Sequence, residues 1–107
     1  MINLEELQKV ELRVGTVLAA EPVAGSEKLL KLKIDLGTEQ REILSGIAKY
    51  YSPEEVTGKQ IILVANLEPR QLMGMESQGM LLAASDAEGR VVLLTTEKAI
   101  APGSNVR

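Results

Sequence analysis

Residues 66–80 read Asn-Leu-Glu-Pro-Arg-Gln-Leu-Met-Gly-Met-Glu-Ser-Gln-Gly-Met and lie between two apolar runs. Ile61-Ile62-Leu63-Val64-Ala65 comes before them, and the second run, Met80-Leu81-Leu82-Ala83-Ala84, begins at their last residue. Short apolar runs bounded by turn-forming residues are typical of buried strands. The pattern predicts one strand ending at Asn66, another beginning near Gly79, and a loop between them. Because binding residues concentrate on loops held by rigid strands, this loop is the first candidate for a functional site.

Working outward, apolar residues alternate with polar ones along residues 10–18 and 30–36, which predicts two half-buried strands. Residues 41–48 form a third strand with Ile43 and Ile47 facing inward. The nearly continuous apolar run at 59–67 predicts a strand buried on both faces. Further strands are expected at 78–85 and 90–96, and regular structure is expected to end at residues 101–103.

Two short helices are marked by capping residues. Asn3 with Glu6 forms a potential capping box, and the helix that follows would turn Leu4 and Leu7 inward. Ser52-Pro53-Glu54-Glu55 combines a capping serine, a proline at the first helical position and a glutamate that can bond back to the cap.

Three strands, a short helix and two or more strands within about a hundred residues are typical of an OB-fold, an all-β five-stranded barrel. The chain is therefore expected to be one domain, residues 1–107, with N- and C-terminal extensions before Lys9 and after Arg90. These extensions would pack outside the barrel or join a partner. Ligands of OB-folds usually meet strands two and three and the loops after strands one and four, here residues 22–28 and 66–78.

Composition excludes several kinds of chemistry. The 107 residues contain no cysteine and no histidine, which leaves out disulfides, thiolate chemistry and the commonest general base and metal ligand. No catalytic residue, metal or cofactor is therefore expected. No apolar run reaches the ~20 residues that a membrane-spanning helix needs, and the N-terminus does not resemble a signal peptide, so a cytoplasmic protein is expected. The net charge is −3, so any role in binding nucleic acid depends on clustered cations.

Lysines gather at the start of the second predicted strand. Lys28, Lys31 and Lys33 lie within six residues, Lys31 and Lys33 share one face of the strand, and only Glu27 offsets them locally. Such lysines can neutralise phosphates. They can equally form a solvated face that discourages edge pairing between chains. Arg13 would lie beside them if the first two strands form a hairpin, or it could simply pair with Glu11.

The 66–78 loop offers further candidates. Asn66 could read a base edge or begin a turn, and Arg70 could clamp a phosphate or stay a surface arginine. Ser77 does not fit the nucleophile motif Gly-x-Ser-x-Gly, and no histidine is present to activate it, but its hydroxyl can form hydrogen bonds. Met80, with Met73 and Met75, could fill the core or form a flexible apolar lip. Lys49 precedes two tyrosines that could stack bases or cover the end of the barrel.

These stretches together resemble the tRNA-binding domain found at the end of many bacterial methionyl-tRNA synthetases and in free-standing tRNA-binding proteins. The similarity runs from about Val10 to Gly103. It depends on Leu12-Arg13-Val14, Gly25-Ser26-Glu27-Lys28-Leu29-Leu30-Lys31-Leu32, Ser45-Gly46-Ile47-Ala48-Lys49-Tyr50-Tyr51, Val64-Ala65-Asn66-Leu67-Glu68-Pro69-Arg70 and Gly74-Met75-Glu76-Ser77-Gln78-Gly79-Met80-Leu81-Leu82-Ala83-Ala84. Met75 departs from the isoleucine that is usual in this last motif.

The resemblance implies an OB-fold that binds tRNA by shape and carries out no chemistry itself. The residues it implies for tRNA binding are Arg13, Lys28, Lys31, Lys49, Asn66, Arg70, Ser77 and Met80. It also implies a homodimer, and a synthetase catalytic core as a further partner if the domain belongs to the enzyme. Export-related chaperones share the fold and several motifs, so binding of unfolded polypeptide is the alternative function.

Overall fold

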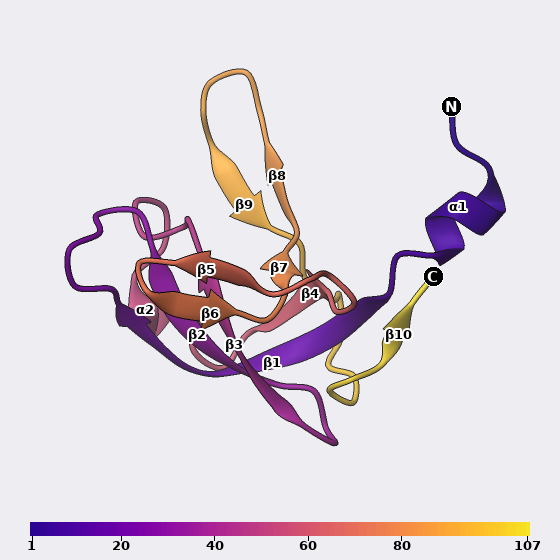
Figure 1. The fold of residues 1–107 in the computed structure, drawn as a ribbon, viewed down its shortest axis with the longest axis horizontal. Coiled ribbons are helices and arrows are strands. Elements are labelled where there is room, and N and C mark those ends of the chain that lie inside the picture. The colour runs from indigo at the N-terminus through magenta and orange to yellow at the C-terminus, as the bar shows by residue number, and fades with distance from the viewer.

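The computed structural model describes residues 1–107 and is built around a strongly curved antiparallel sheet (Figure 1). The sheet has the strand order β3-β2-β1-β4-β7, and β10 also pairs with β1. Its members are β1 (Leu12–Pro22), β2 (Leu30–Asp35), β3 (Gln40–Ser45), β4 (Gln60–Val64), β7 (Met80–Leu81) and β10 (Asn105–Val106). This is the expected all-β, OB-like barrel.

Two small hairpins and two short helices complete the fold. The hairpins are β5 (Arg70–Leu72) with β6 (Met75–Ser77), and β8 (Ala83–Ser85) with β9 (Val91–Leu93). The helices are α1 (Leu4–Gln8) and α2 (Pro53–Val56). Neither helix is long or apolar enough to cross a membrane.

The alternating pattern of β2 is confirmed, since Leu30, Leu32 and Ile34 are all at most 1% exposed. In β1 the predicted inward face is wrong, because Gly15 and Val17 face the core cluster, whereas Leu18 is 42% exposed. The pairing between β1 and β2 shifts between Val17 and Ala19, and beyond this bulge Ala20 takes the position that packs against the core. A local pattern of residues cannot reveal this shift, which depends on both strands.

Helix α2 has the predicted capping box, in which Ser52 Oγ accepts from the Glu55 N–H and the Ser52 N–H donates to the Glu55 carboxylate at 2.9 Å. The bond from the Ser52 N–H holds the pKa of Glu55 below its ordinary value. Helix α1 is also capped, by Asn3. However, the expected inward packing of Leu4 and Leu7 is wrong, since they are 66% and 50% exposed.

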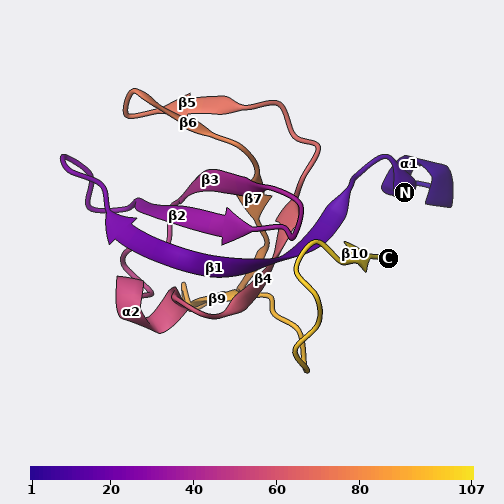
Figure 2. The ribbon, with the colours of Figure 1, turned by 90° about the horizontal axis from the view of Figure 1, so that it is seen from below.

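The C-terminus continues in regular structure past residue 103, contrary to expectation. Gly103, with a φ of 88°, places its N–H 2.7 Å from the Val14 carbonyl, and β10 then pairs with Leu12 and Arg13. A side chain at Gly103 would collide with the Leu36 carbonyl, so only glycine permits this crossing. As a result, both termini lie at the end of the barrel opposite the tip of the β5–β6 hairpin (Figures 1 and 2).

Candidate functional site

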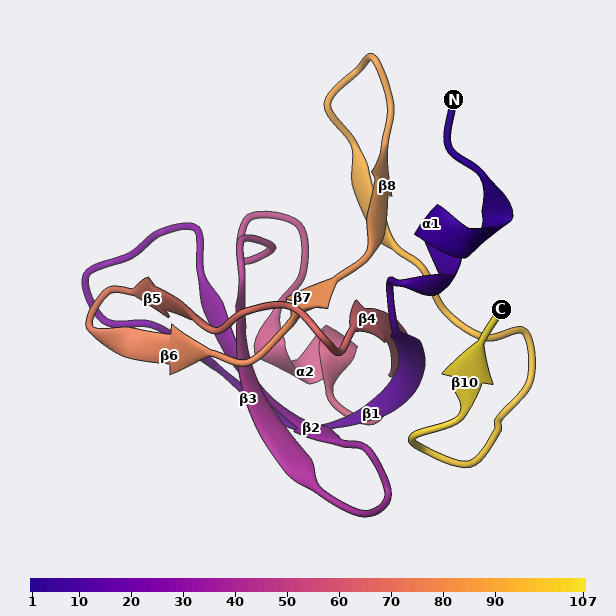
Figure 3. The same ribbon diagram turned by 45° about the vertical axis from the view of Figure 1, so that its right-hand side comes forward.

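At one end of the barrel, the connection from β1 to β2 lies beside the tip of the β5–β6 hairpin (Figure 3). The connection from β3 to α2 is tied to the β1–β2 connection, because the Ala48 N–H donates to the Lys28 carbonyl at 3.0 Å. The β1–β2 connection also meets the hairpin, since a Cβ at Gly25 would lie 3.3 Å from Met73 Cε. The hairpin replaces the loop predicted for residues 66–78. Its two-residue turn, Met73-Gly74, has positive φ at both positions, as type I′ turns require.

Exposed cations without a carboxylate partner lie on the two connections and at the start of β5. Lys28, Lys49 and Arg70 are exposed and take part in none of the six ion pairs of the structure. Lys28 and Lys49 are brought together by the bond between their two connections. Arg70 pairs with Ser77, which contacts β3 beside them. We call Lys28, Lys49 and Arg70 the basic edge.

Lys31 lies beside the basic edge but is already paired. Its ammonium is 3.0 Å from a Glu42 carboxylate oxygen and 4.0 Å from one of Glu21. The hydrogen bond with Glu42 raises the pKa of Lys31 above its ordinary value. Glu27 is the acid nearest to these lysines in the sequence, but the neighbouring strands bring two further acids, Glu21 and Glu42, to Lys31.

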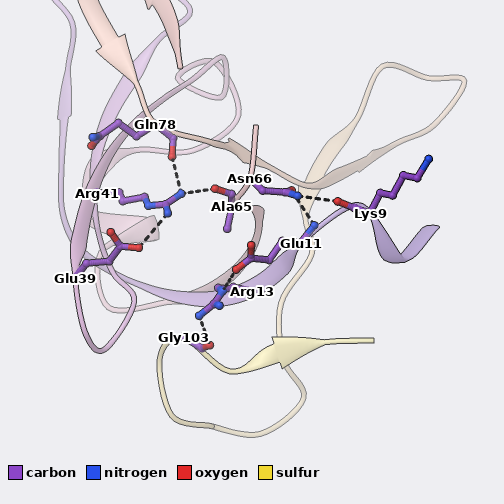
Figure 4. A network of polar contacts seen from close by, with 9 residues as sticks. All are labelled: Lys9, Glu11, Arg13, Glu39, Arg41, Ala65, Asn66, Gln78 and Gly103. Carbon is purple, nitrogen blue, oxygen red and sulfur yellow. Dashed lines mark hydrogen bonds and ion pairs between the residues drawn. The ribbon is translucent and has the colours of Figure 1, made fainter. Parts of the chain in front are cut away.

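Arg13 and Asn66 lie at the other end of the barrel (Figure 4). Lys31 pairs with Glu21, which is eight residues beyond Arg13, or roughly 26 Å along the strand at about 3.3 Å per residue. The expected placement of Arg13 beside the lysines is thus wrong. Its guanidinium instead bonds Glu11 at 2.5 Å and the Gly103 carbonyl at 3.4 Å.

Asn66 uses its side-chain amide to hold the chain that leads into β1. It donates to the Lys9 carbonyl at 2.7 Å and accepts from the Glu11 N–H at 2.8 Å (Figure 4). Both polar atoms of the amide are occupied by backbone groups. A role in reading a base would require these bonds to break.

Ser77 is buried, with only 1% of its surface exposed. Its hydroxyl accepts from the Leu44 N–H at 3.0 Å and donates to the Gly79 carbonyl at 3.2 Å. The bond from Leu44 joins β6 to β3, and the bond to Gly79 holds the chain just after β6. The hydroxyl therefore supports the site from beneath and does not lie on its surface.

Replacing Ser77 by alanine is expected to lower the free energy of unfolding by about 2 kcal/mol, because the buried Leu44 N–H would lose its acceptor. Urea unfolding measures this change. Ser85→Ala, at an exposed position on β8, is the matched control and should change stability by less than about 0.5 kcal/mol. Equal effects of the two substitutions would contradict this role for Ser77.

Apolar and aromatic groups border the same end. Met73 and Tyr50 are 54% and 45% exposed there. Met80, on β7, is 39% exposed but does not lie with them, because it pairs with Val64, which in turn pairs with Leu12. Tyr51 is held against the barrel, because its hydroxyl oxygen accepts from the Leu93 N–H at 3.0 Å. Only Tyr50 is free to stack on a ligand.

Two residues that the sequence did not suggest are Arg41 and Gln78. Arg41 donates to the Ala65 and Gln78 carbonyls, and Gln78 accepts from the Glu42 N–H. No signal in one sequence connects positions 41, 65 and 78, since only closure of the barrel brings them together. No three or more acidic residues gather where they could hold a metal ion.

Fold and site together define an OB-fold binding domain: a small barrel with exposed cations on the connections at one end. A family described as "Putative tRNA binding domain" matches residues 12–105. The chain belongs to this tRNA-binding domain family.

Individual relatives agree. The chain is 57% identical over 105 residues to the methionine–tRNA ligase of Caldanaerobacter subterraneus subsp. tengcongensis. The matched region covers 98% of this chain and 16% of the ligase. The chain therefore spans about 16% of the length of such relatives, and it matches their tRNA-binding part and not their catalytic part.

Two crystal structures resemble the whole chain. The MetRS related protein from Pyrococcus horikoshii has a TM-score of 0.96 and 39% identity, with 100% of this chain and 98% of that chain covered. The chaperone CsaA from Bacillus anthracis strain Ames has a TM-score of 0.91 and 31% identity, with coverage of 100% and 99%.

Proposed function

We propose that this domain binds tRNA by shape, without catalysing a reaction, either as part of a methionyl-tRNA synthetase or as a free-standing relative. In either form it would raise the affinity of a catalytic core for tRNA, because a second attached site increases the effective concentration of the ligand. The proposed place of action is the cytoplasm.

The basic edge is the observation that carries this proposal. Lys28, Lys49 and Arg70 are free of carboxylate partners, so they can pair with phosphates without first breaking an ion pair. Exposed Tyr50 and Met73 beside them could pack against a base or a ribose. Lys31 would contribute less, because a phosphate must compete with Glu42 for its ammonium.

A gel-shift titration with bulk tRNA at 50 and 200 mM salt tests the proposal. Binding should weaken steeply at the higher salt, because each phosphate contact contributes about −0.7 to −0.9 to the slope of log K against log salt. Binding that is absent at both salts would contradict the proposal.

The similarity to the chaperone CsaA makes unfolded polypeptide the competing ligand. The same titration with a reduced, unfolded protein in place of tRNA separates the two functions. Binding to the polypeptide alone would favour the chaperone function, with Met73 and Tyr50 as the exposed apolar contacts.

We also propose that the domain forms a homodimer through α1 and the C-terminal strand. Helix α1 buries none of its residues within the chain. Leu4, Leu7, Val10 and Val106 line an open cleft of about 520 Å³ at this end of the barrel. Apolar side chains of a helix that are left exposed in one chain are typical of an interface with another.

Replacing Leu7 by alanine is expected to raise the dissociation constant of this dimer roughly thirtyfold, since each of two copies would lose about 1 kcal/mol of apolar burial. Sedimentation equilibrium measures the constant. Met73→Ala, which removes an equally exposed apolar side chain from the opposite end, should leave it unchanged. A wild-type chain that remains an 11.6 kDa monomer at micromolar concentration would contradict the dimer.

A further inference from the structure

The β5–β6 hairpin is attached to β3 largely by side chains and not by a regular ladder of backbone bonds. One backbone bond joins them, from the Gln78 N–H to the Glu42 carbonyl at 2.9 Å. Two further N–H groups on the edge of β3 are bonded by side chains: Glu42 N–H donates to Gln78 Oε1 at 3.0 Å, and Leu44 N–H donates to Ser77 Oγ. The direction of the hairpin therefore depends on a few side-chain bonds.

Arg41 joins the two ends of the segment that carries the hairpin. Its Nη1 lies 2.5 Å from the Ala65 carbonyl, where β4 gives way to the segment, and 3.4 Å from the Gln78 carbonyl, where the segment returns (Figure 4). Its Nη2 donates to Glu39 at 3.0 Å, which fixes the plane of the guanidinium. The flat, forked guanidinium suits several fixed acceptors at once.

We propose that Arg41 is a positioning residue for tRNA binding, which holds the base of the β5–β6 hairpin so that Arg70 is kept in line with Lys28 and Lys49. This inference rests on the proposed function. Arg41 is suited to support and not to direct contact, since its side chain is only 23% exposed and its donors are directed at two carbonyls and Glu39.

The test is Arg41→Met, with Arg90→Met as the matched control. Both remove one positive charge that is paired with acids, but Arg90 lies at the turn between β8 and β9 and bonds only Asp86 and Glu88. We expect Arg41→Met to weaken tRNA binding roughly tenfold, as the loss of about one charged hydrogen bond would. The slope of log K against log salt should stay unchanged, because no phosphate contact is lost.

A second readout does not depend on RNA. In NMR spectra, the amide signals of Gln71, Leu72 and Glu76 should shift or broaden in Arg41→Met, while those of Ala84 and Val92 in the β8–β9 hairpin stay in place. Unchanged hairpin signals would overturn the inference even if the wild-type chain failed to bind tRNA, a failure that would count against the proposed function alone.

Two binding results would also overturn the inference. A salt slope reduced by about 0.7 to 0.9 would mean that Arg41 contacts a phosphate itself. An affinity equal to that of Arg90→Met would mean that the hairpin needs no such support. If Arg41→Met does not fold, Arg41→Lys is judged by the same criteria, since it keeps the charge and loses the forked geometry.

Discussion

Reversing two charges of the basic edge, with Lys28→Glu and Arg70→Glu together, is expected to weaken tRNA binding about a thousandfold. Each reversal removes an attraction and adds a repulsion, and each is worth about 1 kcal/mol for unit charges 4 Å apart in water. The four changes sum to about 4 kcal/mol, near three powers of ten in the dissociation constant. Gel-shift titration at low salt measures the loss.

The double reversal also changes the net charge from −3 to −7, so its control must do the same. Arg90→Glu with Lys98→Glu makes this change at two exposed positions outside the basic edge. The control should lose far less affinity, because a distant charge is screened beyond a Debye length of ~10 Å. Equal losses in the two double variants would mean that only total charge matters.

The largest effect on stability is expected from Leu63→Ala. Leu63 is fully buried on β4, pairs with Arg13 and Leu81, and belongs to the main core cluster. The cavity left behind should lower the free energy of unfolding by about 3 kcal/mol. For a domain of this size, that corresponds to a melting temperature lower by roughly 15 °C.

Two variants place this result in context. Val92→Ala, at a position 54% exposed, should change stability by less than about 0.5 kcal/mol. Gly15→Ala alone should destabilise the protein, because a Cβ there would press on Ile34 and lie 3.0 Å from Leu63 Cδ2. Combined with Leu63→Ala it should cost less than the sum of the two, since the new methyl enters the space that the leucine leaves. Strict additivity would contradict this packing.

The sequence predicted those parts of the fold that local chemistry decides. The alternation along β2 and the capping box of α2 depend on neighbours within a few residues, and both are confirmed. The features it could not predict arise from pairing between distant segments. They are the bulge after Val17, the β5–β6 hairpin and the pairing of β10 with β1.

The same distinction separates the predicted site residues. Lys28, Lys49 and Arg70 need only to be exposed, the first two on connections and Arg70 at the start of β5, and sequence can suggest such exposure. The partners of Arg13, Lys31, Asn66 and Ser77 lie on other strands, and those partners change what each side chain is free to do. Arg41 escaped notice for the same reason, because the acceptors of its guanidinium at Ala65 and Gln78 lie 24 and 37 positions away.

The placement of both termini at the end away from the hairpin tip affects how the domain can be combined with other modules (Figure 1). A tether joined to either terminus would leave Lys28, Lys49 and Arg70 pointing outward, away from whatever is attached. The barrel can therefore be joined before or after another domain. A longer connecting peptide would change the distance between the two domains without blocking the basic edge.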